Sequence, residues 1–198
     1  AVNEISVFAM GEKGLQQVSN PSSIFLSNQE NPSSGSMVMV TREATRPLLV
    51  EIQALVDQSN GIPKRVSVGL DQNRLALQLA ILHKHSGIAT FDQDVFINVV
   101  GGIKVSETAS DLVVMLSIVS SLRDKVIPSK WIAFGEVGLT GEVRPVYNAQ
   151  ERLSEAQKQG FELAIIPKGN EPKKPIKGMQ VIPVGYLYQA IQYLLENS

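Results

Sequence analysis

Apolar and polar positions alternate along several short segments of the first 70 residues, and this period of two predicts β-strands. The segments cover residues 5–10, 15–18, 36–43, 47–56 and 64–69. The first two flank Gly-Glu-Lys-Gly, which predicts a hairpin, and a short helix is expected after Pro21. In the fourth segment Glu51 and Gln53 alternate with apolar neighbours, so we expect one wet and one dry face.

Helical periods replace this alternation in two places. Asp71 is a good N-cap for a helix that runs to about Lys84, and the leucines of this segment recur at spacings of four and three, which predicts that a leucine stripe lies in the core. Residues 108–123 are apolar nearly all round, which predicts a helix buried on every side. Ser106 or Thr108 is the expected cap of that helix, and Asp111 suits the positive end of its dipole.

The remainder alternates between strand and helix signals. Strands are expected at 95–100, 131–134, 163–166 and 181–184, and helices at 149–159 and 186–195. The apolar run at 95–100 is typical of a central strand, and glycines at 135, 138 and 141 predict tight turns. A β-rich start followed by alternating elements predicts one α+β (mixed α/β) domain over residues 1–198.

The composition excludes several classes of function for this chain. The 198 residues are 43% hydrophobic and 19% charged with a net charge of −1, so a packed core is expected and a polycationic tail is excluded. The chain has no cysteine and only two histidines, His83 and His85, so we expect no metal site. It has no P-loop or dinucleotide-binding glycine motif. No signal peptide or membrane span is evident, so we expect a cytoplasmic protein, and the missing initiator Met indicates processing or a fragment.

Residues 101–153 carry a resemblance to a family of serine proteases. They include Gly-Gly-Ile-Lys-Val-Ser-Glu-Thr-Ala-Ser-Asp-Leu, Phe-Gly-Glu-Val-Gly-Leu-Thr-Gly-Glu-Val-Arg-Pro-Val and Gln-Glu-Arg-Leu. This stretch resembles the proteolytic domain of Lon proteases, which implies that fold (ribosomal protein S5 domain 2-like) and a Ser-Lys dyad. The dyad positions fall on Ala109 and Gln150, neither of which has the required chemistry, so no catalytic residue is expected. The alternative is an active serine peptidase that uses Ser110, with Lys104 or Lys158 as the nearest candidate bases.

A second resemblance covers nearly the whole chain. Its segments include Glu-Ile-Ser-Val-Phe-Ala-Met, Thr-Arg-Pro-Leu-Leu-Val-Glu-Ile-Gln-Ala-Leu-Val and Asp-Gln-Asp-Val-Phe-Ile-Asn-Val-Val-Gly-Gly. They resemble the C-terminal region of the bacterial RadA (Sms) family of DNA repair proteins. This resemblance implies a non-proteolytic, Lon-like scaffold that supports a homo-hexameric ring during branch migration. It also implies a fragment that lacks a zinc finger and a RecA-like ATPase, where zinc and ATP with Mg²⁺ would bind, and RecA as a partner of the full-length protein.

DNA, single-stranded or branched, is therefore the expected partner, and a chain of net charge −1 can hold phosphates only through a local patch. Two basic groups qualify. The first comprises Lys64, Arg65, Arg74 and Lys84, and the second comprises Lys168, Lys173, Lys174 and Lys177. No aromatic residues interleave with either group in sequence, so we expect contacts to the backbone without sequence specificity. A solvated charged face is the alternative reading of each.

Overall fold

The computed structural model describes residues 8–11, 14–17 and 31–198. Strands β1 (Phe8–Gly11) and β2 (Gly14–Gln17) pair antiparallel, which confirms the expected hairpin over these residues. The helix expected after Pro21 lies outside the described residues.

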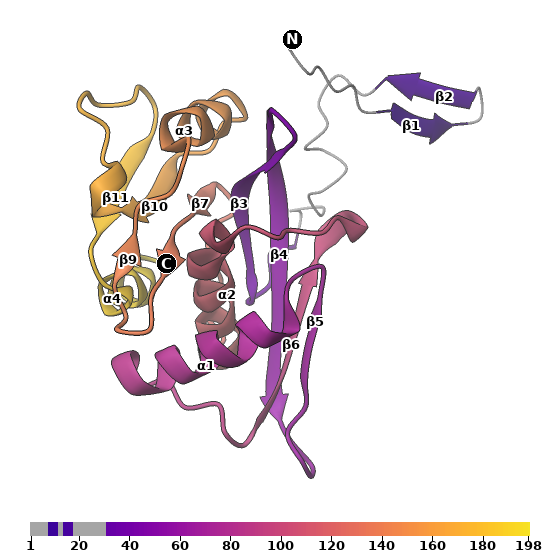
Figure 1. The fold of residues 1–198 in the computed structure, drawn as a ribbon, viewed down its shortest axis with the longest axis vertical. Helices are drawn as coiled ribbons and strands as arrows, with labels where there is room; N and C mark the ends of the chain where they lie inside the picture. The colour runs from indigo at the N-terminus through magenta and orange to yellow at the C-terminus, as the bar shows by residue number, and fades with distance from the viewer. Residues whose placement is uncertain (1–7, 12–13, 18–30) are drawn as a thin grey trace.

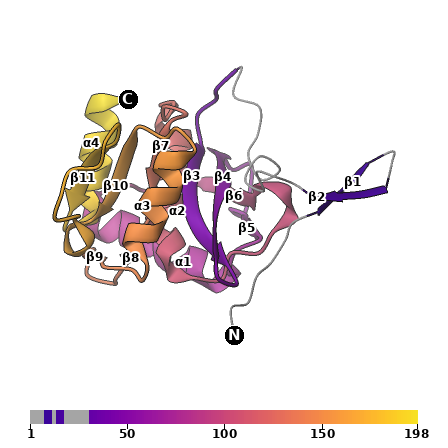
Figure 2. The ribbon, with the colours of Figure 1, turned by 90° about the horizontal axis from the view of Figure 1, so that it is seen from above.

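A seven-stranded sheet organises the rest of the chain (Figure 1). Its order is β11 (Gln180–Val184), β10 (Leu163–Pro167), β7 (Trp131–Ala133), β3 (Ser36–Glu43), β4 (Arg46–Gln58), β6 (Gln93–Val99) and β5 (Arg65–Val68). The β3–β4 and β4–β6 pairs are antiparallel, and the other four neighbouring pairs are parallel. The sheet is therefore mixed and mostly parallel, which confirms the mixed α/β class. Figure 2 shows β11 and α4 (Leu187–Asn197) at the side of the molecule opposite β5.

Helices cover both faces of this sheet. The apolar residues of α1 (Gln72–Ser86), α2 (Asp111–Arg123) and α4 share one core with Val50 and Ile52 of β4. Leu49, which points to the opposite face, packs in a second core with α3 (Ala149–Lys158). Successive residues of a strand thus pack in different cores, because their side chains point to opposite faces of the sheet.

Two sequence predictions about helices hold in detail. Asp71 caps α1 by accepting a hydrogen bond from the Asn73 N–H at 2.9 Å, and the leucine stripe of this helix is buried. All residues of α2 from 111 to 120 are buried, as an apolar surface on every side requires. The expected cap of α2 was wrong. The 3₁₀ turn η3 (Thr108–Ser110) precedes the helix, and no side chain caps either element.

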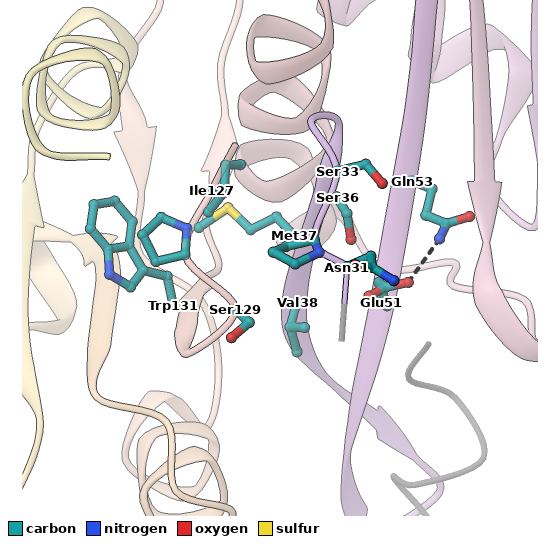
Figure 3. A pocket seen from close by; sticks show the side chains of 12 residues that line it. Asn31, Ser33, Ser36, Met37, Val38, Glu51, Gln53, Ile127, Ser129 and Trp131 are labelled. Atoms are coloured by element: carbon teal, nitrogen blue, oxygen red, sulfur yellow. Dashed lines mark hydrogen bonds between the residues drawn. The ribbon is translucent and has the colours of Figure 1, made fainter. Parts of the chain in front are cut away.

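Two predictions about strands need correction. The run at 95–100 forms β6, which is paired on both sides, by β4 and β5, but its Asn98 side chain is exposed, so the strand is not buried on both faces as its apolar run predicts. The wet face expected at Glu51 is absent, because Glu51 is fully buried and accepts a hydrogen bond from Gln53 Nε2 at 2.9 Å. Residues 31–33 and 127–129 close over this part of the sheet. They leave a cavity of about 80 Å³ into which Glu51 faces, with Trp131 in its wall (Figure 3).

Candidate functional site

The two positions that the Lon resemblance assigns to a Ser-Lys dyad lie in η3 and in α3. Ala109 is buried in η3, and Gln150 is exposed in the first turn of α3. An alanine methyl group cannot act as a nucleophile, and a glutamine amide cannot take a proton at neutral pH. The pair therefore offers no route to covalent catalysis.

An ion pair between a buried arginine and a partly exposed glutamate joins these two segments instead. Arg152 of α3 is only 2% exposed, and its guanidinium donates to both carboxylate oxygens of Glu107 at 2.6 and 2.7 Å. The same guanidinium donates to the carbonyl oxygens of Val40 at 2.5 Å and Tyr147 at 3.0 Å, and Thr41 Oγ1 donates to Glu107 at 3.0 Å. A planar guanidinium fits such a bidentate, multi-carbonyl arrangement. The network therefore fastens α3 to β3 and to the residue that precedes η3.

Ser110 does not occupy the position of an activated nucleophile. It is 3% exposed, and its Oγ donates to the backbone carbonyl of Glu107 at 2.9 Å. Lys104 and Lys158 are both exposed, and within residues 31–198 no hydrogen bond joins Ser110 to a lysine. A serine hydroxyl needs an adjacent base, so the geometry does not support peptidase chemistry here.

A second buried carboxylate organises the start of α2. Asp111 is fully buried and accepts from Arg74 Nε at 2.9 Å, from the second Arg74 nitrogen, from Gln78 Nε2 at 2.9 Å and from the Val137 N–H at 3.0 Å. The hydrogen bond to Asp111 is the main cause of a raised pKa for Arg74. Asp111 thus ties α1, α2 and β8 (Glu136–Val137) together, beyond the helix-dipole role that its position in the sequence suggested.

The first basic group is divided by these internal contacts. Arg74 is paired with Asp111, and Arg65 donates to the carbonyl oxygens of Gln93 and Thr90, the latter at 2.7 Å. Lys64 and Lys84 are exposed, the former just before β5 and the latter in the last turn of α1. Only two of the four cations therefore direct their charge to solvent.

The second basic group lies together on one connection. Its four lysines are exposed and occupy η4 (Lys168–Asn170) and the following loop between β10 and β11. Asn170 anchors the start of the loop, since its side chain accepts from the Val146 N–H at 2.8 Å and donates to the Val146 carbonyl at 3.1 Å. Gln157 Nε2 donates to the Lys177 carbonyl at 3.0 Å and anchors its end. We call residues 168–177 the lysine loop.

The histidines lie in the last turn of α1, as expected for a helix end. His85 Nε2 lies 2.8 Å from the Leu139 carbonyl oxygen. Across the described ranges, no group of three His, Cys, Asp or Glu residues is placed to hold a metal ion. None of the helices described is both long enough and apolar enough to cross a bilayer.

Residues 55–170 match the family model described as subunit ChlI of Mg-chelatase, which is more than half of the chain. The chain belongs to this family. The match contains Ala109 and Gln150, the Arg152–Glu107 pair and Asp111, and it ends at the last residue of η4, before Lys173.

Curated relatives extend the similarity beyond that match. The chain is 59% identical to DNA repair protein RadA of Pseudomonas aeruginosa over 99% of its length, and 60% identical to that of Escherichia coli over 96%. It is 44% identical to the RadA of Bacillus subtilis over 97%. Along nearly its whole length the chain is therefore a RadA-family sequence. It spans only 44%, 42% and 42% of these three relatives.

Proposed function

We propose that the chain is a non-proteolytic domain of a DNA repair protein, and that it contacts the DNA backbone through the lysine loop. One observation carries the proposal. A chain that is up to 60% identical to proteins named for DNA repair exposes four lysines on a single anchored loop, with Glu171 as the exposed acid among them. The degenerate dyad and the bonded Ser110 hydroxyl support the non-proteolytic part.

The charge balance favours phosphate contact without base readout. The chain as a whole carries a net charge of −1, whereas the lysine loop combines four lysines with one glutamate for a local charge of +3. Lysine is a flexible point charge that suits phosphate oxygens, and each neutralised phosphate of duplex DNA contributes about −0.9 to the slope of log affinity against log salt. We expect binding that weakens steeply with salt.

Assembly into a homo-hexameric ring is the second part of the proposal. The Lon-like resemblance supports a head-to-tail interface that closes, and six lysine loops around one pore would convert a weak contact into useful avidity. ATP with Mg²⁺ and zinc would bind elsewhere in the longer protein, which would act with RecA in branch migration in the cytoplasm. Light scattering across a concentration series tests the ring, and a mass that stays at 21.5 kDa would contradict assembly by this chain alone.

A matched pair of charge reversals tests the DNA contact. Lys173→Glu with Lys174→Glu alters the lysine loop, while Lys104→Glu with Arg123→Glu changes two exposed cations elsewhere. Both variants have the same net charge, so general repulsion is equal. Fluorescence anisotropy with labelled DNA should show at least a tenfold loss, on the order of 1.4 kcal/mol, for the first variant alone. Equal losses in the two variants would show that the loop has no special role.

Peptidase activity is tested on the same preparation. The wild-type chain should not cleave casein, and Ser110→Ala should leave that result unchanged, because the Oγ of Ser110 is held by a backbone carbonyl at 2.9 Å. Cleavage that disappears in Ser110→Ala would establish the alternative, an active serine peptidase.

A further inference from the structure

The connection between β4 and β5, at the lower end of the sheet in Figure 1, carries an asparagine followed by a glycine. Asn60 and Gly61 are both exposed, and the next residue, Ile62, is 91% exposed. The pair is the single Asn-Gly dipeptide of the 198-residue sequence. Within the described residues no hydrogen bond holds the Asn60 side chain, and a Cβ added at Gly61 would meet no atom within 4 Å. The space in which these two residues approach each other is therefore open.

The backbone nitrogen of Gly61 lies outside the sheet. Strand β4 ends at Gln58 and β5 begins at Arg65, so neither ladder uses this N–H group. It donates to Ser59 Oγ at 3.3 Å, which is longer than the roughly 2.7–3.2 Å of an ordinary N–H···O hydrogen bond. The Ser59 hydroxyl in turn donates to the Gly61 carbonyl oxygen at 3.1 Å. A long bond to a side chain in an exposed turn is a weak restraint, so the nitrogen is available for reaction.

The reaction that this pair can undergo is an internal cyclisation. The Gly61 nitrogen attacks Asn60 Cγ, the new N–Cγ bond closes a succinimide ring, and the Cγ–Nδ2 bond breaks as ammonia leaves with the Gly61 proton. Glycine favours this step because it has no Cβ to crowd the nitrogen and its backbone is permissive. Solvent water then opens the ring at either carbonyl carbon, which leaves aspartate or isoaspartate. In sum, an amide and a water molecule give a carboxylic acid and ammonia, with no change of oxidation state.

Other asparagines of the described chain lack one of these conditions. Asn31 precedes a proline, which has no N–H proton to lose. Asn73 lies in the first turn of α1 and Asn98 lies in β6, where regular hydrogen bonding restrains the backbone. The Asn170 side chain is held by two hydrogen bonds to the backbone of Val146. The structure thus singles out one asparagine by both its neighbour and its surroundings.

We propose that Asn60 is a site of spontaneous deamidation, so that the connection between β4 and β5 acquires a carboxylate as the protein ages. The change adds a negative charge to a chain whose net charge is −1. The new charge lies between exposed Asp57 and exposed Lys64 in sequence, so a turn with one acid and one base becomes acidic. In the isoaspartate product the chain also runs through the side-chain carbon, which lengthens the connection by one backbone atom.

Peptide mapping of the folded 198-residue chain follows the reaction over days at neutral and at mildly alkaline pH. Trypsin releases residues 43–64 as one peptide, because Pro47 protects the bond after Arg46, and Asn60 is its single asparagine. Mass spectrometry measures the fraction of this peptide that carries an acid, and chromatography separates the aspartate and isoaspartate forms. A zero-time sample corrects for reaction during digestion. The tryptic peptide 169–173, which contains Asn170, is the internal control.

Gly61→Ala is the matched variant, since its Cβ enters open space and leaves the fold intact. Circular dichroism and the urea midpoint establish that it is folded. We expect the acid form of peptide 43–64 to accumulate about tenfold faster in wild type than in Gly61→Ala, because alanine crowds the attacking nitrogen. The rate should rise with pH, because the nitrogen must lose its proton, and the peptide with Asn170 should stay unchanged.

The products decide the route. Isoaspartate must appear together with aspartate, because direct hydrolysis of the side chain gives aspartate alone. Equal rates in wild type and Gly61→Ala, or aspartate without isoaspartate, would overturn the proposal. A peptide 43–64 that gains acid only after the chain is unfolded in urea would overturn it as well, since the folded turn would then prevent ring closure.

Discussion

Replacing Arg152 by methionine should be among the most destabilising single substitutions in this chain, although the preceding residue, Glu151, is exposed at the surface. Methionine keeps much of the side-chain volume and the helix propensity of α3 while it removes the charge and every donor. Arg152 is 2% exposed and makes hydrogen bonds to Glu107 and to two backbone carbonyls. The substitution therefore tests the contribution of the buried network with little change in packing.

The expected loss follows from which groups keep access to water. Glu107 is 30% exposed and partly rehydrates, whereas the Val40 carbonyl loses a buried charged donor. Removing one partner of a buried pair costs about 3–5 kcal/mol, and the partial exposure of Glu107 places the loss near the lower limit, at about 3 kcal/mol. For a chain of this size the melting temperature should fall by roughly 10 °C.

Urea unfolding followed by circular dichroism, and by the fluorescence of the single tryptophan, measures this loss directly. The matched control is Glu151→Ala in the same helix, α3. It removes an exposed ion pair with Arg42, whose charged atoms lie 2.9 Å apart, and should lower the free energy of unfolding by less than about 1 kcal/mol. A loss below about 1 kcal/mol for Arg152→Met, with an unchanged slope against urea, would refute the view that this network holds α3 in place.

Three further outcomes follow from the structure. Asp111→Asn should lower the free energy of unfolding by about 3–5 kcal/mol, measured by urea unfolding, because it removes the charge from a fully buried hub. Gly35→Ala should lower the free energy of unfolding by about 2 kcal/mol or more, because φ is +93° and a Cβ would lie 2.2 Å from a carbonyl oxygen of β4. The control Gly61→Ala places its Cβ in open space and should leave the free energy of unfolding nearly unchanged. Thr140→Val should raise the pKa of Glu142, as an NMR titration of its carboxyl carbon would show. Because the pKa of Glu142 is lowered in the folded state, its ionised carboxylate stabilises the fold above pH 4.5, the ordinary pKa, and this stabilisation is lost as the pH falls through the lowered pKa. The free energies of unfolding of Thr140→Val and wild type should therefore become equal at low pH.

Much of the fold was predictable because it depends on neighbours within one element. The leucine stripe of α1, the apolar surface of α2 and the cap at Asp71 are all local patterns, and each is confirmed. The lysine loop was also predictable as a group, since its four lysines lie within ten residues of one another between two strands. The DNA contact assigned to it stays a prediction.

The contacts that distinguish this molecule join residues far apart in the chain. Arg152 and Glu107 are 45 residues apart, and Arg74 and Asp111 are 37 apart, so no periodicity indicated that they would meet. Alternation along β4 shows only that the Glu51 side chain points away from the core that holds Val50 and Ile52. It cannot show that other segments of the chain cover the opposite face of the sheet and bury Glu51 there.

The sequence by itself therefore determined the family and the helices and strands with strong local patterns, since these depend on residue types and short spacings. The tertiary structure alone decided that two arginines of interest are engaged in internal contacts and that a carboxylate is buried in β4. The physical reason is that strand order and crossover connections set which distant side chains share a surface, and short-range patterns carry no record of that order.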